Sequence, residues 1–309
     1  MKIENINANS FKRLIAGTIA LWPEHERFLN KSFEAHSALD VAHLTRLADD
    51  INSLIGDDLP RFVRGYRWIC EAFIEVDIYF RRHGKYQCTS FEDANRKVYS
   101  NAGTMALYMD GLLLSQLLWS PHCKSYMYYS LNFLPRLPPK YRLLEIGCGH
   151  GLLLANAARD PRSAGVCGLD VSAESLRHAR ETMEHFGCGA KVDFIQADID
   201  DNIPTNSFDG LVLSELLEHL EDPAGVLVRL KSQIKPGGLV YLNIPINSPA
   251  PDHIYLWRTI EEVAHFVVDC GYEIVETAQV PMTGYSLERA ISLEASINCL
   301  VTATKQRQP

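Results

Sequence analysis

The stretch LEIGCGHG, from Leu144 to Gly151, decides the fold of the second half of the chain. An apolar run with one acidic residue leads into three glycines at alternate positions, which is the pattern of a strand that turns into a helix. Glycines let the main chain approach a ligand closely, and the first N–H groups of the helix attract a nucleotide-like group. A dinucleotide-binding turn reads G-x-G-x-x-G, but position 152 is Leu, so the spacing disfavours an NAD-dependent oxidoreductase.

From Tyr141 onward, short apolar runs alternate with helical stretches, which predicts an α/β protein with a largely parallel sheet. We expect seven strands, at 142–146, 165–169, 191–195, 208–213, 238–244, 272–278 and 296–304, and helices at 151–159, 173–186, 222–233 and 260–270. The last helix carries a capping-box pattern at Thr259 and Glu262 and ends at Gly271. The final two strands lack a clear crossover helix between them, which leaves room for one antiparallel strand.

The N-terminal part is predicted to be helical, because apolar residues recur at three- and four-residue spacing. Of the 29 Phe, Trp and Tyr residues, 20 precede position 142. We therefore expect two domains: an all-helical lid and substrate-binding region over residues 1–139, and an α/β domain over residues 140–309. The linker RLPPKY, at 136–141, marks the boundary.

The charge and composition of the chain limit the classes of molecule that it is expected to bind. The formal net charge of −8 and the isoelectric point near 5.8 argue against binding of nucleic acid or an anionic membrane by general electrostatics. The eight cysteines are scattered without metal-ligand spacing, as in reduced thiols, and no apolar stretch approaches the roughly 18 residues of a membrane span. These features predict a cytoplasmic protein with a small-molecule substrate; they leave the oligomeric state open.

Further markers follow the glycine stretch at regular places. Asp170 ends the second predicted strand, where an acid can accept hydrogen bonds from both hydroxyls of a ribose. In QADI, at 196–199, the carboxylate of Asp198 can meet an adenine amine while Ile199 packs on the ring. The fourth and fifth turns lie in FDGLVLSELLEHLEDP, at 208–223, and in KPGG, at 235–238. Each marker is common, but the ordered set is not.

This ordered set resembles that of the class I S-adenosylmethionine-dependent methyltransferases. The resemblance implies a Rossmann-like seven-stranded sheet with an antiparallel last strand, S-adenosylmethionine (SAM) as cofactor, and methyl transfer as the reaction. It places Glu145, Gly147, Gly149 and Gly151 around the methionine portion, Asp170 on the ribose, and Ser214 or Glu215 beside the methionine or sulfonium. The predicted cofactor-binding residues are Glu145, Gly147, Cys148, Gly149, Gly151, Asp170, Val171, Asp198, Ile199, Ser214 and Glu215.

The second substrate is expected near aromatic residues of the helical region. We expect Phe62, Trp68 and Phe73 to form its core, because aromatic residues at helical spacing usually pack. The tyrosines in SYMYYSLNF cannot all face one side of a helix, so at least one should point toward the cofactor domain. An aromatic wall would attract a sulfonium and exclude water. The candidates are Tyr108, Tyr126, Tyr128 and Tyr129.

A second candidate region is the loop NIPINSPAPDHIYLW, at 243–257. Its prolines favour an extended chain beyond the fifth strand, where ligands of open α/β sheets bind. Asn247, Asp252, His253 and Tyr255 are positioned to reach the substrate, although His and Asp of a solvated loop would cap neighbouring elements equally well. His253, His219 or a tyrosine is the candidate base. The predicted catalytic residues are Tyr108, Tyr126, Tyr128, His219, Asp252 and His253.

The run ELLEH contains Glu215, Glu218 and His219, which would share one face of a helix. It resembles the ExxEH run of ubiquinone-pathway O-methyltransferases, which is linked to a metal. The same run occurs in relatives without such a role, and we expect hydrogen bonding that shapes the turn, with no metal.

Two other functions stay open beside methyl transfer to a small molecule in natural-product biosynthesis. Methyltransferase-like azetidine-2-carboxylate synthases form a four-membered ring when the α-amine of SAM attacks its own γ-carbon and expels methylthioadenosine; such an enzyme needs no second substrate. A non-catalytic SAM-binding subunit is the third possibility.

Overall fold

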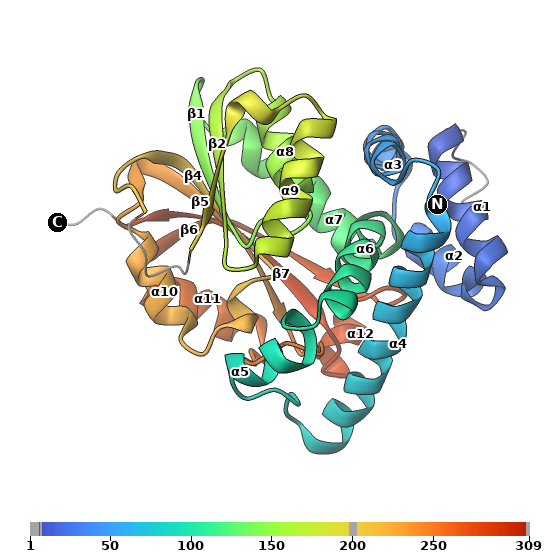
Figure 1. The fold of residues 1–309 in the computed structure, drawn as a ribbon. Helices are drawn as coiled ribbons and strands as arrows, with labels where there is room; N and C mark the ends of the chain where they lie inside the picture. Colours follow the sequence, from blue (N-terminus) through green and yellow to red (C-terminus); the bar gives the residue numbers. More distant parts are fainter. Residues whose placement is uncertain (1–5, 7, 198–202, 307–309) are drawn as a thin grey trace.

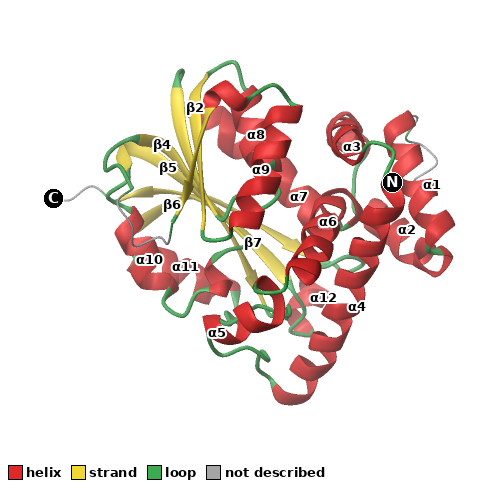
Figure 2. Cartoon of the chain, viewed as in Figure 1, coloured by secondary structure: helices red, strands yellow, loops and turns green. Residues whose placement is uncertain are grey.

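In the computed structural model, the described residues are 6, 8–197 and 203–306. Asp198 and Ile199, the predicted adenine contacts, lie outside these ranges. The described strands form one seven-stranded sheet in the order β3-β2-β1-β4-β5-β7-β6 (Figures 1 and 2). Their bounds are β1 Tyr141–Ile146, β2 Ser163–Asp170, β3 Val192–Gln196, β4 Phe208–Ser214, β5 Ile234–Ile246, β6 Tyr272–Pro281 and β7 Ile297–Lys305. The predicted Rossmann-like sheet is confirmed.

The sheet is parallel from β3 to β5, and β7 runs antiparallel to both of its neighbours. Strand β5 extends beyond its predicted limits because it pairs with β7 as far as Ile246. The chain order reverses direction between β1 and β4, and the crevice beyond the carboxyl ends of such strands is where open α/β sheets bind ligands. The glycine stretch therefore opens directly into that crevice.

Helices cover both faces of the sheet, which explains why its central strands are apolar on both sides. Figure 1 shows α8 and α9 on one face and α10 and α11 on the other. Their bounds are α8 Leu152–Arg159, α9 Ala173–His185, α10 Pro223–Leu230 and α11 Ile260–Asp269, with α12 Leu287–Ser292 between β6 and β7. Helix α11 has the predicted capping box of Thr259 and Glu262. Helix α10 ends before the predicted residue 233 because main-chain groups at 232–233 bond the start of β4.

The N-terminal region is helical as predicted. It contains α1 Asn9–Leu21, α2 Glu26–Glu34, α3 Val41–Ile55, α4 Leu59–His83, α5 Phe91–Ala94, α6 Ala102–Leu118 and α7 Ser120–Tyr128. One apolar cluster contains buried side chains from each of the helices α1, α2, α3, α4 and α6. Phe62 is buried in it as expected, whereas Trp68 and Phe73 are only partly buried at its border. Side chains from Tyr128 to Leu137 pack with the sheet, although they precede the predicted boundary at residue 139. No helix of the described residues is long and apolar enough to span a membrane.

Helices α4 and α6 cross in main-chain contact at Gly65 and Gly111. A Cβ atom at Gly111 would lie 2.6 Å from the carbonyl oxygen of Gly65, and one at Gly65 would lie 2.6 Å from the carbonyl oxygen of Leu107. Only glycine fits at such distances. The crossing holds Tyr108 on α6 and Phe73 on α4, both of which reach the site described below.

We expect Gly111→Ala to lower the free energy of unfolding by about 1–3 kcal/mol, because the added methyl group overpacks this crossing. Gly103→Ala, in the first turn of the same helix, meets only a side-chain oxygen at 3.4 Å and should leave stability unchanged or raise it by up to about 1 kcal/mol. Urea unfolding of both variants measures the difference. Equal effects would contradict the close crossing.

Candidate functional site

A cavity of about 1750 Å³ lies between the carboxyl ends of the strands and the helical region. Its walls come from the glycine turn after β1, the end of β2, the loops after β4 and β5, and helices α4 and α6. Among the predicted residues, the cavity is lined by Tyr108, Glu145, Gly147, Cys148, Gly149, Asp170, Val171, Ser214, Glu215, His219, Asn247, Asp252 and His253. The structure thus brings most of the predicted residues to one cavity.

The glycine turn allows two close approaches. Gly147, Gly149 and Gly151 all have positive φ angles, of 70°, 47° and 75°. A Cβ at Gly147 would lie 2.9 Å from Leu216, and one at Gly151 would lie 2.8 Å from the Cα of Ala179. The turn therefore brings α8 against α9 and leaves main-chain N–H groups at the cavity.

Two acids stand beside this turn. Asp170 accepts hydrogen bonds from the N–H of Ser172 at 2.9 Å and of Gly149 at 3.4 Å, which orient its carboxylate at the end of β2. Glu145 is buried, and its Oε2 has no hydrogen-bond partner among the described residues. Burial, with a contribution from Asp170, raises the pKa of Glu145 well above its usual range. An unpartnered carboxyl oxygen next to a cradle without Cβ atoms fits the ammonium group of an amino-acid ligand.

Glu215 starts the turn after β4 with a positive φ of 52°, an uncommon conformation for a non-glycine residue. Its Oε1 accepts hydrogen bonds from the side-chain amides of Asn243 on β5, at 2.7 Å, and Asn298 on β7, at 2.6 Å. Burial raises the pKa of Glu215 to about 7. Glu218 is fully buried, and burial beside Glu215 raises its pKa well above the usual range.

Asp252 joins the loop after β5 to the helical region. It is fully buried, and its carboxylate accepts hydrogen bonds from Tyr99, at 2.8 Å, and Tyr108, at 3.2 Å. Burial next to Asp252 raises the pKa of both phenols far above 10, so they remain donors. Tyr99 was not predicted, since nothing in its local sequence distinguishes it from the other tyrosines of the helical region.

Hydrogen-bond partners assign the tautomers of the two histidines beside Asp252. The Nδ1 of His219 lies 3.2 Å from the main-chain oxygen of Asp252, and the Nδ1 of His253 lies 2.6 Å from that of Ser248. Carbonyl oxygens only accept hydrogen bonds, so each Nδ1 is the donor, which in a neutral ring leaves Nε2 as the acceptor. Burial lowers the pKa of His253 to about 3, which keeps this ring neutral.

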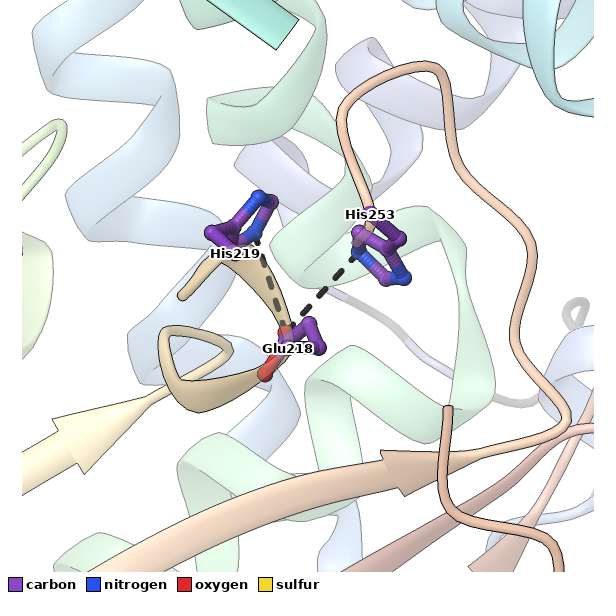
Figure 3. A group of neighbouring side chains, drawn as sticks. All are labelled: Glu218, His219 and His253. Atoms are coloured by element: carbon purple, nitrogen blue, oxygen red, sulfur yellow. Dashed lines mark ion pairs between the residues drawn. The ribbon is translucent and has the colours of Figure 1, made fainter. Parts of the chain in front are cut away.

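Both Nε2 atoms face Glu218 (Figure 3). They lie 3.7 Å and 3.8 Å from its Oε1, and Glu218, His219 and His253 offer ligand atoms within 4.8 Å of one another. Imidazole and carboxylate are the donors that divalent transition metals accept, so these three residues could hold such an ion. The expectation that Glu215, Glu218 and His219 share one face of a helix is wrong, although the carboxyl groups of Glu215 and Glu218 do meet. Residues 217–219 form only a 3₁₀ turn, and Glu215 points to the amides of Asn243 and Asn298.

Other predicted residues lie away from the cavity. Tyr126 accepts a hydrogen bond from Asn156, at 2.8 Å, and Tyr128 reaches Thr302, at 3.2 Å, so the segment does face the α/β part. Neither Tyr126 nor Tyr128, nor Tyr129, is among the described residues that line the cavity. Their hydroxyls are used in packing the helices on the sheet, which corrects their prediction as catalytic residues. Tyr255 is exposed and packs on Trp257.

Comparison with known proteins agrees with this arrangement. Residues 144–240 match a family described as a methyltransferase domain. Ubiquinone biosynthesis O-methyltransferases from Vibrio atlanticus and Klebsiella pneumoniae are 36% and 34% identical over 104 residues, which are 33% of this chain and 42% and 41% of theirs. The chain thus spans less than half the length of these relatives.

Two solved structures align with part of the chain. The [4+2]-cyclase SpnF aligns over 56% of this chain and 78% of its own, with 20% identity and a TM-score of 0.46. A putative sarcosine dimethylglycine methyltransferase from Galdieria sulphuraria aligns over 62% and 86%, with 14% identity and a TM-score of 0.49.

Residues 144–240, which run from the glycine turn into β5, thus match a methyltransferase domain, as the glycine turn and the ordered strand ends predicted.

The raised pKa of Glu215 predicts a pH-dependent stability. Such a carboxyl contributes most stability below its unfolded pKa of about 4.3 and loses that contribution as pH rises through about 7. Glu215→Gln keeps an acceptor oxygen but does not titrate, so its free energy of unfolding relative to wild type should rise between pH 5 and pH 8. Urea unfolding at both pH values measures this. Glu273→Gln, at an exposed position of β6, should show the same difference at both. A pH-independent difference for Glu215→Gln would contradict the assignment.

Proposed function

We propose that the protein transfers the methyl group of SAM to a hydroxyl oxygen of a small molecule, and that His219 accepts the hydroxyl proton. The observation that carries this proposal is that one cavity is lined by the glycine turn and Asp170 and also by Asp252 and His219, called here the Asp252–His219 group. A role in natural-product biosynthesis is part of the proposal, and the neighbouring genes would test it.

The residues beside the glycine turn suit the cofactor. Gly147 and Gly149 would lie against its methionine portion, Glu145 would accept from its ammonium group, and Asp170 from the ribose hydroxyls. Val171 is half-exposed at the cavity and would pack on the adenosine. Bound SAM supplies a methyl group on a positively charged sulfur, and Glu215 with a pKa of about 7 can balance that charge.

The size of the cavity favours an intermolecular reaction. Pockets for one drug-sized ligand have volumes of about 300–1000 Å³, and this cavity has about 1750 Å³. The azetidine-forming reaction would need room for SAM alone. The cavity is also lined by α6 from Tyr108 to Gln116 and by Trp119 beyond it, which leaves room for an acceptor beside the cofactor.

His219 has the features of a base for an oxygen acceptor. Its Nδ1–H is held by the main-chain oxygen of Asp252, and its Nε2, 3.7 Å from the Oε1 of Glu218, would accept the proton. Asp252 lies 3.6 Å from the same ring and would stabilise the imidazolium that forms. A hydroxyl must lose its proton during methyl transfer, so this group suits an alcohol or phenol. The match to enzymes named O-methyltransferases supports the same acceptor atom.

The test is product analysis after incubation with SAM alone and with SAM plus a panel of hydroxyl-bearing acceptors. The proposal predicts S-adenosylhomocysteine only when an acceptor is present. Methylthioadenosine with a ring-closed amino acid from SAM alone would replace the proposal with the cyclase. Binding of SAM without any turnover across the panel would favour the non-catalytic subunit. Loss of turnover in EDTA, restored by a divalent ion, would assign Glu218, His219 and His253 to a metal instead of a base.

We expect His219→Asn to lower kcat by about 10²- to 10⁴-fold with little change in the KM for SAM, because the variant loses the proton acceptor. His265→Asn, on the exposed side of α11, is the matched control and should retain wild-type kcat. Steady-state kinetics with the acceptor identified above measures both. A His219→Asn enzyme within threefold of wild type would contradict the assigned base.

A further inference from the structure

One arm of the cavity is walled by aromatic rings from the N-terminal helices. We define the ring chamber as six residues that line the cavity: Trp22, His25, Phe28, Phe73, Trp119 and His122. The sequence pattern predicts a place in the core for Phe73 and indicates no function for Trp22, His25, Phe28, Trp119 or His122. The helical rise from Tyr108 to Trp119 separates this chamber from the Asp252–His219 group by roughly 16 Å along α6.

The rings of the chamber hold one another in place. His25 stacks on Trp22 with ring centres 3.9 Å apart, and on Phe28 at 4.7 Å. The ring centre of Trp119 lies 5.3 Å from that of Phe73, in an edge-to-face contact, and 4.9 Å from that of His122, in a tilted contact. Such stacked and edge-to-face pairs form a preorganised wall for another flat ring.

The chamber carries no net charge. Burial lowers the pKa of both His25 and His122 to about 4, so the two imidazoles are neutral near pH 7. Both also have hydrogen-bond partners: Tyr66 lies 2.8 Å from His25, and Ser115 lies 2.9 Å from His122. An ion entering here would lose hydration without gaining a partner of opposite charge.

A positive charge already lies against the chamber wall. The guanidinium of Arg67 lies 5.4 Å from the centre of the Trp22 ring, which His25 stacks on as well. At the rim, the ionised groups of α4 pair with each other, since Arg81 donates to Asp77 at 3.3 Å. A cationic ligand in the chamber would therefore be repelled by Arg67, which already contacts the Trp22 ring.

The rim of the cavity also carries exposed apolar side chains. Ile74 and Ile78 on α4 are 61% and 48% exposed, and Phe91 is 44% exposed, although all three line the cavity. Exposed apolar residues grouped at an opening commonly mark a ligand entrance. The path into the chamber thus suits an uncharged molecule.

We propose that the ring chamber binds a flat, uncharged aromatic ring of the methyl acceptor and discriminates against acceptors that carry a charge on that ring. This inference rests on the proposed function, because it names the class of acceptor. The cofactor end of the cavity carries Glu145, Asp170 and Glu215, so the two ends differ in polarity and would take the two substrates in one orientation.

The test compares three probes that share one ring system: naphthol, naphthoate and naphthyltrimethylammonium. Calorimetric titration into protein saturated with S-adenosylhomocysteine should show naphthol binding at least about tenfold more tightly than either ion. Phe73→Ala should weaken naphthol at least about tenfold, and Phe73→Leu should weaken it less. Tyr79→Ala, on the same helix but away from the cavity-lining residues, should leave naphthol affinity unchanged. All variants should keep the wild-type affinity for S-adenosylhomocysteine.

The outcomes separate the two proposals. Either ion binding as tightly as naphthol, or unchanged naphthol affinity in both Phe73 variants, overturns the ring chamber and leaves the proposed function standing. Absence of S-adenosylhomocysteine binding contradicts the proposed function instead. The same probes titrated into protein alone then still decide whether the chamber prefers an uncharged ring.

Discussion

The constraint on which this structure depends is the gathering of carboxyl groups at one water-poor edge of the sheet. Parallel strands all deliver their carboxyl ends to the same side, and Glu145, Asp170 and Glu215 come from three of them. Burial raises the pKa of each carboxyl group, so each either holds a proton or is stabilised in its ionised form by a nearby cation. A ligand with an ammonium and a sulfonium group would place two positive charges beside these carboxyl groups, which suits the binding of SAM.

The helical region covers this edge. Helices α4 and α6 cross through Gly65 and Gly111, and the close contact holds their inner faces over the carboxyl ends of the strands. Tyr99 and Tyr108 from this region donate to Asp252 of the loop after β5. The same loop is fixed by the main-chain oxygen of Glu218, which accepts from the N–H groups of Ile254 and Tyr255. The candidate base and the helical region are therefore linked through Asp252 by hydrogen bonds.

Much of the fold could be predicted because it is encoded locally. The seven strands follow from short apolar runs, and the glycine positions and Asp170 follow from the ends of those runs. The contacts that shape the site are not local. Asn243 and Asn298 meet Glu215 across strands, and His253 meets Glu218 from another loop, so no spacing in the sequence could indicate them. The helix expected for ELLEH is only a 3₁₀ turn, because the chain bends at Glu215 to reach those amides.

The most direct test of the central claim is calorimetric binding of SAM and S-adenosylhomocysteine at pH 6 and pH 8. The two ligands differ by the charged methyl-sulfonium, and burial raises the pKa of Glu215 to about 7. We predict that both bind wild type, that neither binds Asp170→Ala, and that the affinity of SAM relative to S-adenosylhomocysteine rises up to about tenfold with pH. A ratio that does not change with pH, or undiminished binding to Asp170→Ala, would contradict the account.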